Sequence, residues 1–293
     1  MKVLDAIFND ITTHWEKKLP FALYSKPGER NFTVLLQENA ATHLVSDFRE
    51  KGFVFAPFAD GVPLLIPEDA ADISGYDYEV HDEQKEFDQA ESGISDESAF
   101  VALVSRAVNC IKEGQFTKVV LSRNEIVPLE NFKLSETYLN ILTRYPAAFR
   151  YCFFHPQAGL WMGATPELLI KADDTNFATV ALAGTQRINS AANVIWMEKE
   201  RQEHIIVTDC IVEALRTIAH DVKISETKTH SAGNLIHLKT DIRGTMTNDA
   251  GVKELVQSLH PTPAICGMPK SAAKKFISAN EGYDREYYSG YLG

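Results

Sequence analysis

The sequence is poor in cysteine and has no long apolar run. Its 293 residues include four cysteines, which are widely spaced and form no C-x-x-C pair: Cys110, Cys152, Cys210 and Cys266. This density excludes a disulfide-stapled scaffold and is typical of a reducing compartment. The N-terminal segment "MKVLDAIFNDITTHWEKKLPFALY" interrupts its apolar positions with charges, so it lacks the apolar core of a signal peptide or a membrane span. We therefore expect a cytoplasmic protein that is neither exported nor inserted into a membrane.

Basic residues are also scarce relative to acidic ones. The chain has 29 Lys and Arg against 40 Asp and Glu, a net charge of -11 and a pI near 5.3. Binding to nucleic acid or to an anionic membrane depends on Lys and Arg that neutralise phosphates, so we expect neither partner. Four common signatures are absent as well: a Walker A loop, G-x-G-x-x-G after a strand, H-E-x-x-H and G-x-S-x-G. Their absence removes the common nucleotide-binding, zinc-protease and serine-hydrolase hypotheses.

The pattern of apolar residues predicts a mixture of helices and strands. Before an acidic stretch at 81–97 we expect a helix over about 3–18 and three short strands, "NFTVLLQ", "GFVFAPF" and "VPLLIP". The acidic stretch is nearly devoid of aliphatic residues, as in a solvated connection. We therefore place a boundary near residue 95, which divides the chain into 1–95 and 96–293.

The second part is expected to continue with both kinds of element. One helix ends before Gly114, and another spans about 196–219. Between them, "AFRYCFFH", "GLWMGATPELLIKAD" and "NFATVALAGT" are strand-like, and the turn signals that join them suggest one antiparallel meander. "NLIHLKTDIRGTM" alternates as a strand with Ile236, Leu238 and Ile242 on one face, and a short helix follows "HPTPAICGMP".

A lone lysine interrupts the strand-like run "QFTKVVLSR" at 115–123. In an extended chain Lys118 shares a face with Phe116 and Val120, so its amine lies between apolar neighbours. Burial lowers the pKa of an ammonium group and can produce a neutral amine that acts as a general base. The alternative is a lysine whose stem lies along apolar surface while its head reaches water or a carboxylate, and periodicity alone favours that alternative.

Glu167 is a candidate general acid. It lies in "MGATPELL", where Gly163 and Pro166 interrupt a strand, as at a bulge or where a ligand approaches the backbone. Leu168 and Leu169 follow it, and an apolar environment raises the pKa of a carboxyl group. An ordinary edge-strand glutamate is the alternative.

Two carboxylates share one stripe of the helix expected over 196–219. Glu200 and Glu203 fall at i and i+3, and the stripe continues with the apolar Val207 and Ile211. Paired acids on the buried side of a helix need a cation, and hard oxygen ligands suit Mg²⁺. A solvated first turn, stabilised by the helix dipole, is an equally good interpretation.

Three further residues could line a site. Gly184 and Thr185 end the apolar strand of "ALAGTQR", where backbone N–H groups and a hydroxyl could hold a carboxylate. His237 lies on the polar face of its strand. For each of them an ordinary turn or a hydrogen-bonded structural role is the commoner alternative.

Six motifs in order resemble those of the chorismate-utilising enzymes, which include isochorismate synthase, salicylate synthase and anthranilate synthase component I. They cover residues 115 to 293: "FTKVVLSR", "GATPELL", "ALAGT", "KERQEH", "HLKTDIRG" and "LHPTPAICGMPK" with "EGYDREYYSGYLG". The resemblance implies an α+β fold of two packed antiparallel sheets flanked by helices. It also implies a Mg²⁺-dependent site for chorismate, and a monomer is expected.

Within this family, a lysine at position 118 marks the members that use water rather than ammonia as nucleophile. The resemblance therefore implies an isomerase, isochorismate synthase, which serves menaquinone or siderophore synthesis, with salicylate synthase as the alternative. Lys118 would deprotonate water for attack at C2 of chorismate, and Glu167 would protonate the departing C4 hydroxyl. Glu203, with Glu200 nearby, would hold Mg²⁺, and the substrate pocket would be lined by four residues: Gly184, Thr185, His237 and Tyr288.

The sequence departs from the family at its C-terminal end. It stops at "YYSGYLG", where members continue into a segment that normally supplies a substrate-binding arginine, a glycine-rich loop, a second glutamate for Mg²⁺ and a lysine. We therefore expect a C-terminally incomplete isochorismate synthase. A short, non-catalytic chorismate-binding protein is the alternative.

Overall fold

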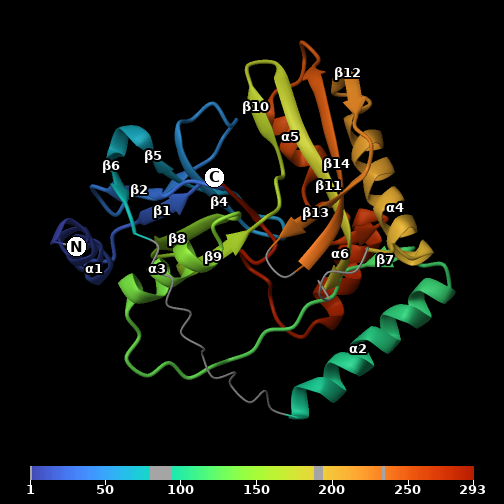
Figure 1. Cartoon of the computed structure of the whole chain (residues 1–293), viewed down its shortest axis with the longest axis horizontal. Coiled ribbons are helices and arrows are strands. Elements are labelled where there is room, and N and C mark those ends of the chain that lie inside the picture. Colours follow the sequence, from blue (N-terminus) through green and yellow to red (C-terminus); the bar gives the residue numbers. More distant parts are fainter. Residues whose placement is uncertain (1, 80–93, 188–193, 233–234) are drawn as a thin grey trace.

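The computed structural model describes residues 2–79, 94–187, 194–232 and 235–293, and all statements below concern these residues. Within them every strand pairing is antiparallel. Helices and antiparallel sheets occur along the whole described chain, which confirms the predicted α+β class (Figure 1). Most of the acidic stretch predicted as a connection, residues 81–93, lies outside the described residues.

The first large sheet combines strands from both sides of the boundary expected near residue 95. Its order is β6 (Ala71–Asp77), β2 (Asn31–Gln37), β1 (Phe21–Ser25), β8 (Phe149–His155) and β9 (Gly159–Thr165). Strand β1 pairs with β8, where Leu23 lies opposite Cys152. The boundary near residue 95 stays a prediction, and hydrogen bonds between β1 and β8 link the two ranges that it separates.

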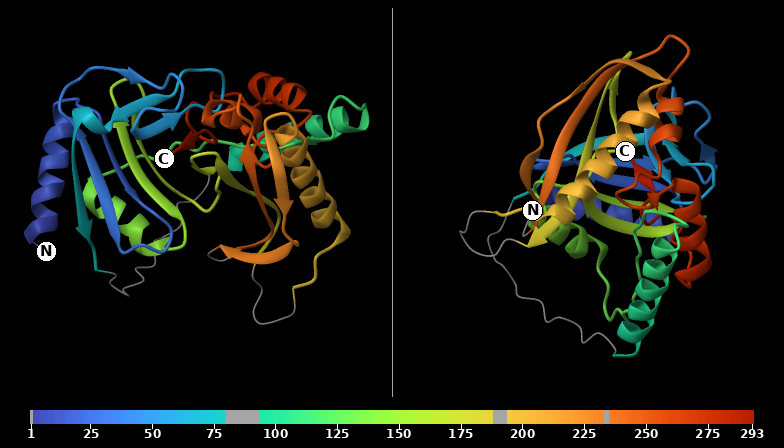
Figure 2. Two further views of the ribbon diagram at one scale, coloured as in Figure 1. Left: turned by 90° about the horizontal axis from the view of Figure 1, so that it is seen from above. Right: turned by 90° about the vertical axis from the view of Figure 1, so that its right-hand side faces the viewer.

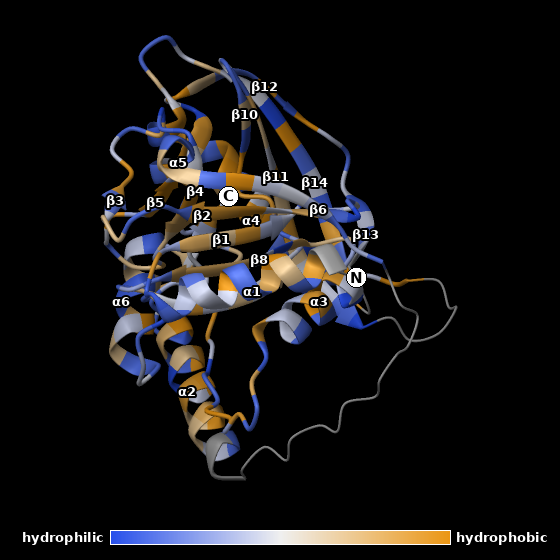
Figure 3. Ribbon diagram, turned by 90° about the vertical axis from the view of Figure 1, so that its left-hand side faces the viewer, coloured by the Kyte–Doolittle hydropathy of each residue, from blue (hydrophilic) through white to orange (hydrophobic). Residues whose placement is uncertain are grey.

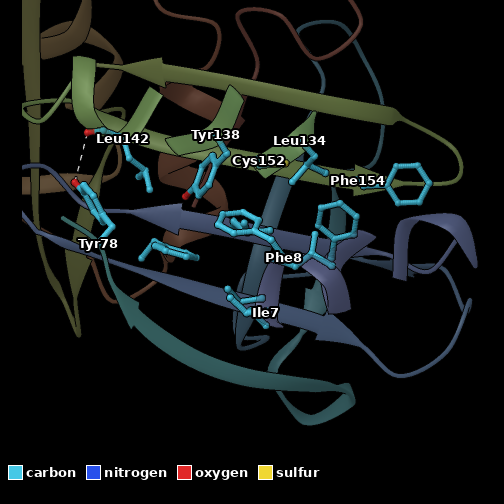
Figure 4. Packing of buried hydrophobic residues seen from close by; sticks show 13 residues of the cluster. Ile7, Phe8, Tyr78, Leu134, Tyr138, Leu142, Cys152 and Phe154 are labelled. Carbon is cyan, nitrogen blue, oxygen red and sulfur yellow. Dashed lines mark hydrogen bonds between the residues drawn. The ribbon is translucent and has the colours of Figure 1, made fainter. Parts of the chain in front are cut away.

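Two helices cover one face of this sheet. They are α1 (Lys2–Glu16) and α3 (Leu134–Arg144), which pack against β1 and against β8 and β9 respectively (Figure 3). The core between helices and sheet contains Ile7 and Phe8 from α1 and Tyr138 and Leu142 from α3 (Figure 4). Since apolar residues recur at helical spacing on both segments, this burial follows directly from the sequence.

A buried arginine ties this part of the fold together. Arg150, on β8, is fully buried and donates hydrogen bonds to the Tyr78 hydroxyl at 2.6 Å, the Ser25 hydroxyl at 2.6 Å and the Leu142 carbonyl at 3.1 Å. A guanidinium group has five N–H donors, so it can satisfy several buried acceptors at once. Arg150 is therefore a structural crosslink of the first sheet.

The second large sheet carries the longest strands. Its order is β10 (Lys171–Asp173), β11 (Asn176–Arg187), β14 (Leu235–Met246) and β12 (Ala219–Ile224), and β13 (Lys228–Ala232) also pairs with β14. Helices α4 (Glu198–Leu215) and α5 (Val252–Leu259) pack on it. The predicted alternation of β14 is confirmed, because Ile236, Leu238 and Ile242 are all buried. Figure 2 shows the two large sheets on opposite sides of the molecule in its left-hand view.

The predicted three-strand meander is wrong. β8 and β9 pair with each other in the first sheet, whereas β10 and β11 pair in the second. The chain crosses from one sheet to the other after Thr165, where Pro166 has no N–H to donate to a strand ladder. Local alternation identified the strands correctly, but it carries no information about their partners. Helices α3 and α5 were also not predicted.

Two smaller sheets and two helices complete the described fold. β16 (Tyr291–Leu292), β4 (Gly52–Ala56), β5 (Leu64–Pro67) and β3 (His43–Leu44) form one sheet, and a 3-10 turn, η1 (Glu68–Ala70), follows β5. β7 (Lys118–Val119) pairs with β15 (Gly267–Met268), next to α6 (Lys270–Asn280), and α2 (Ile94–Lys112) precedes β7. In the described part of the chain no helix is both long and apolar enough to span a bilayer.

Candidate active site

Residues 117–121, which include Lys118, lie between β15 and a small apolar core. Strand β7 has two residues rather than the nine of the predicted run, and hydrogen bonds on both sides extend its pairing: Thr117 N–H donates to the Met268 carbonyl at 2.8 Å and Val120 N–H to the Cys266 carbonyl at 2.8 Å. Val119 and Leu121 pack against the cluster of Phe58, Cys266, Ala273 and Ile277. Val119 and Leu121 therefore share the face predicted for them, opposite to that of Lys118.

Gly267 permits the close approach of these two strands. It has φ +144°, and a Cβ at this position would lie 2.2 Å from the Lys118 carbonyl oxygen. Such a distance is far below van der Waals contact, and the backbone atom that it meets cannot rotate away. The glycine is therefore required for the position of Lys118.

The Lys118 amine is mostly buried and faces a carboxylate. Its side chain is 12% exposed, and Nζ donates a hydrogen bond to the Pro263 carbonyl at 2.6 Å and lies 3.7 Å from Glu203 Oε1. Burial lowers the pKa of Lys118 below its ordinary value, and attraction to Glu203 and then Glu167 opposes that shift. The Lys118 amine does reach a carboxylate, as expected for a lysine with a purely structural role. Its lowered pKa, however, also makes the amine easier to deprotonate.

Glu167 has the complementary shift. It is partly buried just after Pro166, at the crossing between the sheets, and its backbone N–H donates to the Thr165 hydroxyl at 3.2 Å. Burial raises the pKa of Glu167, and the nearby charge of Lys118 opposes this. Burial thus shifts the two pKa values in opposite directions, so that the carboxyl group keeps its proton to a higher pH and the amine releases its proton at a lower pH, as suits a general acid and a general base.

Helix α4 brings its two carboxylates to the same place. Val207 and Ile211 are buried, so the stripe predicted for this helix faces the second sheet. Glu203 faces Lys118, and Glu200 has a buried Oε2 for which the described residues provide no hydrogen-bond partner. An unsatisfied carboxylate oxygen of this kind needs a cation or water.

These two carboxylates fit Mg²⁺. The ion typically takes one or two protein carboxylates, with waters and a substrate anion completing its shell. Three or more His, Cys, Asp or Glu side chains that could close around a metal are not found among the described residues. Glu200 and Glu203 thus suit a cation that substrate helps to hold, rather than a closed protein cage.

Gly184 marks an irregularity where β11 meets α4. The pairing of β11 with β14 shifts between Ala183 and Thr185, and Gly184 has φ +71°. A Cβ at Gly184 would lie 3.0 Å from the Glu200 carbonyl oxygen, so the glycine allows α4 to approach β11 closely. It thereby sets the position of the Glu200 turn.

Thr185 and His237 form a cross-strand pair beside this bulge. Thr185 Oγ1 and His237 Nδ1 are 3.0 Å apart, in a hydrogen bond whose direction depends on the histidine tautomer. Burial lowers the pKa of His237, and the neighbouring His230 lowers it further. A neutral imidazole and a hydroxyl are suitable partners for a polar ligand, and the role of this pair in binding substrate stays a prediction.

Tyr288 is an exposed residue that neighbours Arg285. Its ring is exposed, its backbone N–H donates to the Arg285 carbonyl at 2.8 Å, and the Arg285 guanidinium is 6.0 Å from the ring centre. Arg285 in turn bonds to the backbone at Val120. A direct role for Tyr288 in substrate binding stays a prediction.

The sequence interpretation missed two groups that build the site. The Pro263 carbonyl orients the Lys118 amine, and no side-chain pattern could reveal a backbone acceptor 145 positions away in the chain. Arg285 lies within the quoted segment "EGYDREYYSGYLG", so the signal was present, but its acidic partner could not be identified without the fold.

The fold and the site define a mixed α+β protein in which β7 carries an amine, the chain after β9 carries a carboxyl group and helix α4 carries two further carboxylates. The profile of the family described as "Chorismate binding enzyme" matches residues 66–293, and the chain belongs to this family. It is similar to the salicylate biosynthesis isochorismate synthase of Pseudomonas aeruginosa, with 31% identity over 216 residues, 70% of this chain and 45% of that protein. It is also 30% identical to the isochorismate synthase EntC of Escherichia coli K12 over 68% of this chain and 54% of EntC.

A solved structure supports the fold independently. A putative 2,3-dihydroxybenzoate-specific isochorismate synthase, DhbC from Bacillus anthracis, superposes with a TM-score of 0.74 at 20% identity, covering 99% of this chain and 84% of that one. At this identity the likeness establishes the shared fold. The chain spans about half the length of the two curated relatives described above, 45% and 54%.

Proposed function

We propose that the protein is an isochorismate synthase, an isomerase that converts chorismate to isochorismate for menaquinone or siderophore synthesis. The observation that carries the proposal is the proximity of Lys118, Glu167 and Glu203, with the amine 3.7 Å from Glu203 and opposite pKa shifts on Lys118 and Glu167. The similarity to several isochorismate synthases supports it.

In the proposed reaction one water enters and one leaves. Lys118 takes a proton from water as its oxygen bonds to C2 of chorismate, the ring double bonds shift, and the C4–O bond breaks. Glu167 gives its proton to the departing C4 hydroxyl, which leaves as water, so substrate and product are isomers. Each proton transfer by a positioned group of this kind contributes about 10²- to 10⁴-fold to the rate.

The remaining residues bind and orient the substrate. Gly184, Thr185 and His237 offer backbone and side-chain donors at the end of β11, and Tyr288 is included because of the family resemblance. Mg²⁺, held by Glu203 with Glu200 nearby, would supply positive charge for the ring carboxylate of a dianionic substrate. This local cation suits a protein whose net charge is -11.

The proposal extends to the cellular setting. Four free cysteines, two of them buried, support a cytoplasmic protein, and we propose that it acts as a monomer. The functional part is tested by incubating the purified protein with chorismate and Mg²⁺ and separating the products by chromatography. Isochorismate supports the proposal. Salicylate with pyruvate selects the salicylate synthase alternative, and aminated product with ammonia refutes both.

A non-catalytic chorismate-binding protein is distinguished by calorimetry. Binding of chorismate without any turnover would identify this alternative. Turnover that is lost in Lys118→Ala would identify the enzyme.

A further inference from the structure

A buried ion pair lies directly behind the segment that carries Lys118. Arg285 and Glu281 are four residues apart, and their side chains are 2% and 0% exposed. Arg285 Nε donates to Glu281 Oε2 at 2.8 Å, and Nη2 donates to Oε1 at 2.6 Å. A two-point contact between a planar guanidinium and a carboxylate fixes both groups in one relative orientation. The pair is therefore a rigid unit inside the protein.

This unit holds the backbone just after the lysine at two points. Arg285 Nη2 donates to the Val120 carbonyl at 2.8 Å. Glu281 Oε1 accepts hydrogen bonds from Ser122 N–H at 2.7 Å and from the Ser122 hydroxyl at 3.0 Å. Both contacts involve a charged partner, which strengthens them. Two and four residues after Lys118, the chain is thus bonded to the same ion pair.

Contacts on the other sides keep the pair in place. Arg285 Nη1 donates to the Ile265 carbonyl at 3.0 Å, and its guanidinium lies 4.4 Å from the Phe58 ring centre. The Ser122 hydroxyl is 2.6 Å from the hydroxyl of Tyr283. Ile265 precedes β15, the strand that pairs with the lysine strand, so Arg285 bonds to both chain segments that define the lysine position.

We propose that Arg285, acting with Glu281, is a positioning residue that sets the place from which Lys118 reaches the substrate. The inference rests on the proposed role of Lys118 as base. Burial keeps Arg285 away from solvent, so it acts through the backbone of residues 120–122 and not by binding substrate. A displacement of about 1 Å in a reacting group can lower a rate about 10²-fold. Because the position of Lys118 depends on several hydrogen bonds from Arg285, the role of Arg285 requires the forked guanidinium group and not positive charge alone.

Two matched variants of the full chain separate positioning from general stability. Arg285→Lys keeps the charge, but an ammonium group has three N–H donors and cannot replace the four hydrogen bonds that Arg285 makes to Glu281, Val120 and Ile265. Arg150→Lys makes the same chemical change at another buried arginine, which contacts the first sheet instead. For each variant kcat, KM for chorismate and the melting temperature are measured, alone and combined with Lys118→Ala.

The expected result is specific to Arg285. Arg285→Lys lowers kcat about 10- to 100-fold with little change in KM, whereas Arg150→Lys lowers the melting temperature and leaves kcat near the wild-type value. In the Lys118→Ala background, Arg285→Lys causes no further loss. Equal losses of kcat in the two arginine variants, or an undiminished loss without Lys118, would overturn the proposal. If Arg285→Lys does not fold, Tyr283→Phe takes its place, because it removes only the hydroxyl contact to Ser122.

The proposed function and the positioning role of Arg285 can fail separately, and different measurements detect the two failures. If the wild-type protein makes no isochorismate, the function is refuted, and positioning is then tested by the reactivity of the Lys118 amine toward acetic anhydride, followed by peptide mass spectrometry. A severalfold change in Lys118 labelling in Arg285→Lys but not in Arg150→Lys supports the positioning role. Equal labelling of Lys118 in all three proteins overturns it.

Discussion

Replacing Glu167 by glutamine should inactivate the protein and stabilise it at the same time. The change keeps the shape of the side chain and removes both its proton and its charge. Loss of a general acid lowers the rate by about 10²- to 10⁴-fold, which is about 3 to 5 kcal/mol of transition-state stabilisation. Stability changes in the opposite sense because burial raises the pKa of Glu167.

Proton linkage determines how the free energy of unfolding changes with pH. A carboxyl group with a raised pKa in the folded protein contributes stability below its unfolded pKa, about 4.3. That contribution is lost as the pH rises through the folded-state pKa, since the folded protein then holds a charge that it disfavours. Glutamine does not ionise, so Glu167→Gln gains relative to the wild type as the pH rises, by about 1.4 kcal/mol for each unit by which the pKa is raised.

The assay is urea unfolding of both proteins at several pH values between 4 and 8, with product formation measured at pH 7.5. The exposed Glu130→Gln is the control for the removal of one carboxylate, and it should leave the activity unchanged. A stability difference between Glu167→Gln and the wild type that does not grow with pH would refute the argument that this carboxyl is disfavoured in its charged form.

Two further predictions concern the surroundings of the site. Gly184→Ala places a Cβ against the Glu200 carbonyl at φ +71°, whereas Gly282→Ala has φ +80° and open space around its Cβ. Chemical denaturation should show that backbone strain destabilises both variants by about 1 to 2 kcal/mol, and that Gly184→Ala is destabilised further and loses activity. Equal effects of the two substitutions would contradict the close contact at Gly184. Burial lowers the pKa of His260 to about 4, so its contribution to stability is complete above pH 6.5 and is lost as the pH falls toward 4. Acid unfolding of His260→Asn should therefore lack up to about 3 kcal/mol of this pH-dependent loss, and an unchanged pH profile would show that His260 is not the group responsible.

Much of the site could be predicted because its residues obey local patterns. The common face of Val119 and Leu121, opposite to that of Lys118, followed from strand alternation, and the stripe that Glu200 and Glu203 share with the buried Val207 and Ile211 followed from helical spacing. Each pattern was ambiguous alone, since a structural lysine and a solvated first turn give the same spacing. The order of six motifs, rather than any single residue, pointed to the family that the profile match establishes.

Other features depend on contacts between distant segments. The chain leaves one sheet after Thr165 and enters another at Lys171, and local alternation gives no sign of this exchange. The Pro263 carbonyl and Arg285 act on the lysine segment from 145 and 165 positions away. Such long-range hydrogen bonds are decided by topology, which a sequence pattern with a range of a few residues cannot supply.

The most direct test of the account is the source of the new oxygen atom in the product. Wild-type protein and Lys118→Gln are incubated with chorismate and Mg²⁺ in ¹⁸O-labelled water, and the product is analysed by mass spectrometry. We expect isochorismate with one ¹⁸O at C2, formed about 10²- to 10⁴-fold more slowly by Lys118→Gln although chorismate still binds. Isochorismate without ¹⁸O, or equal rates for the two proteins, would contradict the claim that Lys118 activates water.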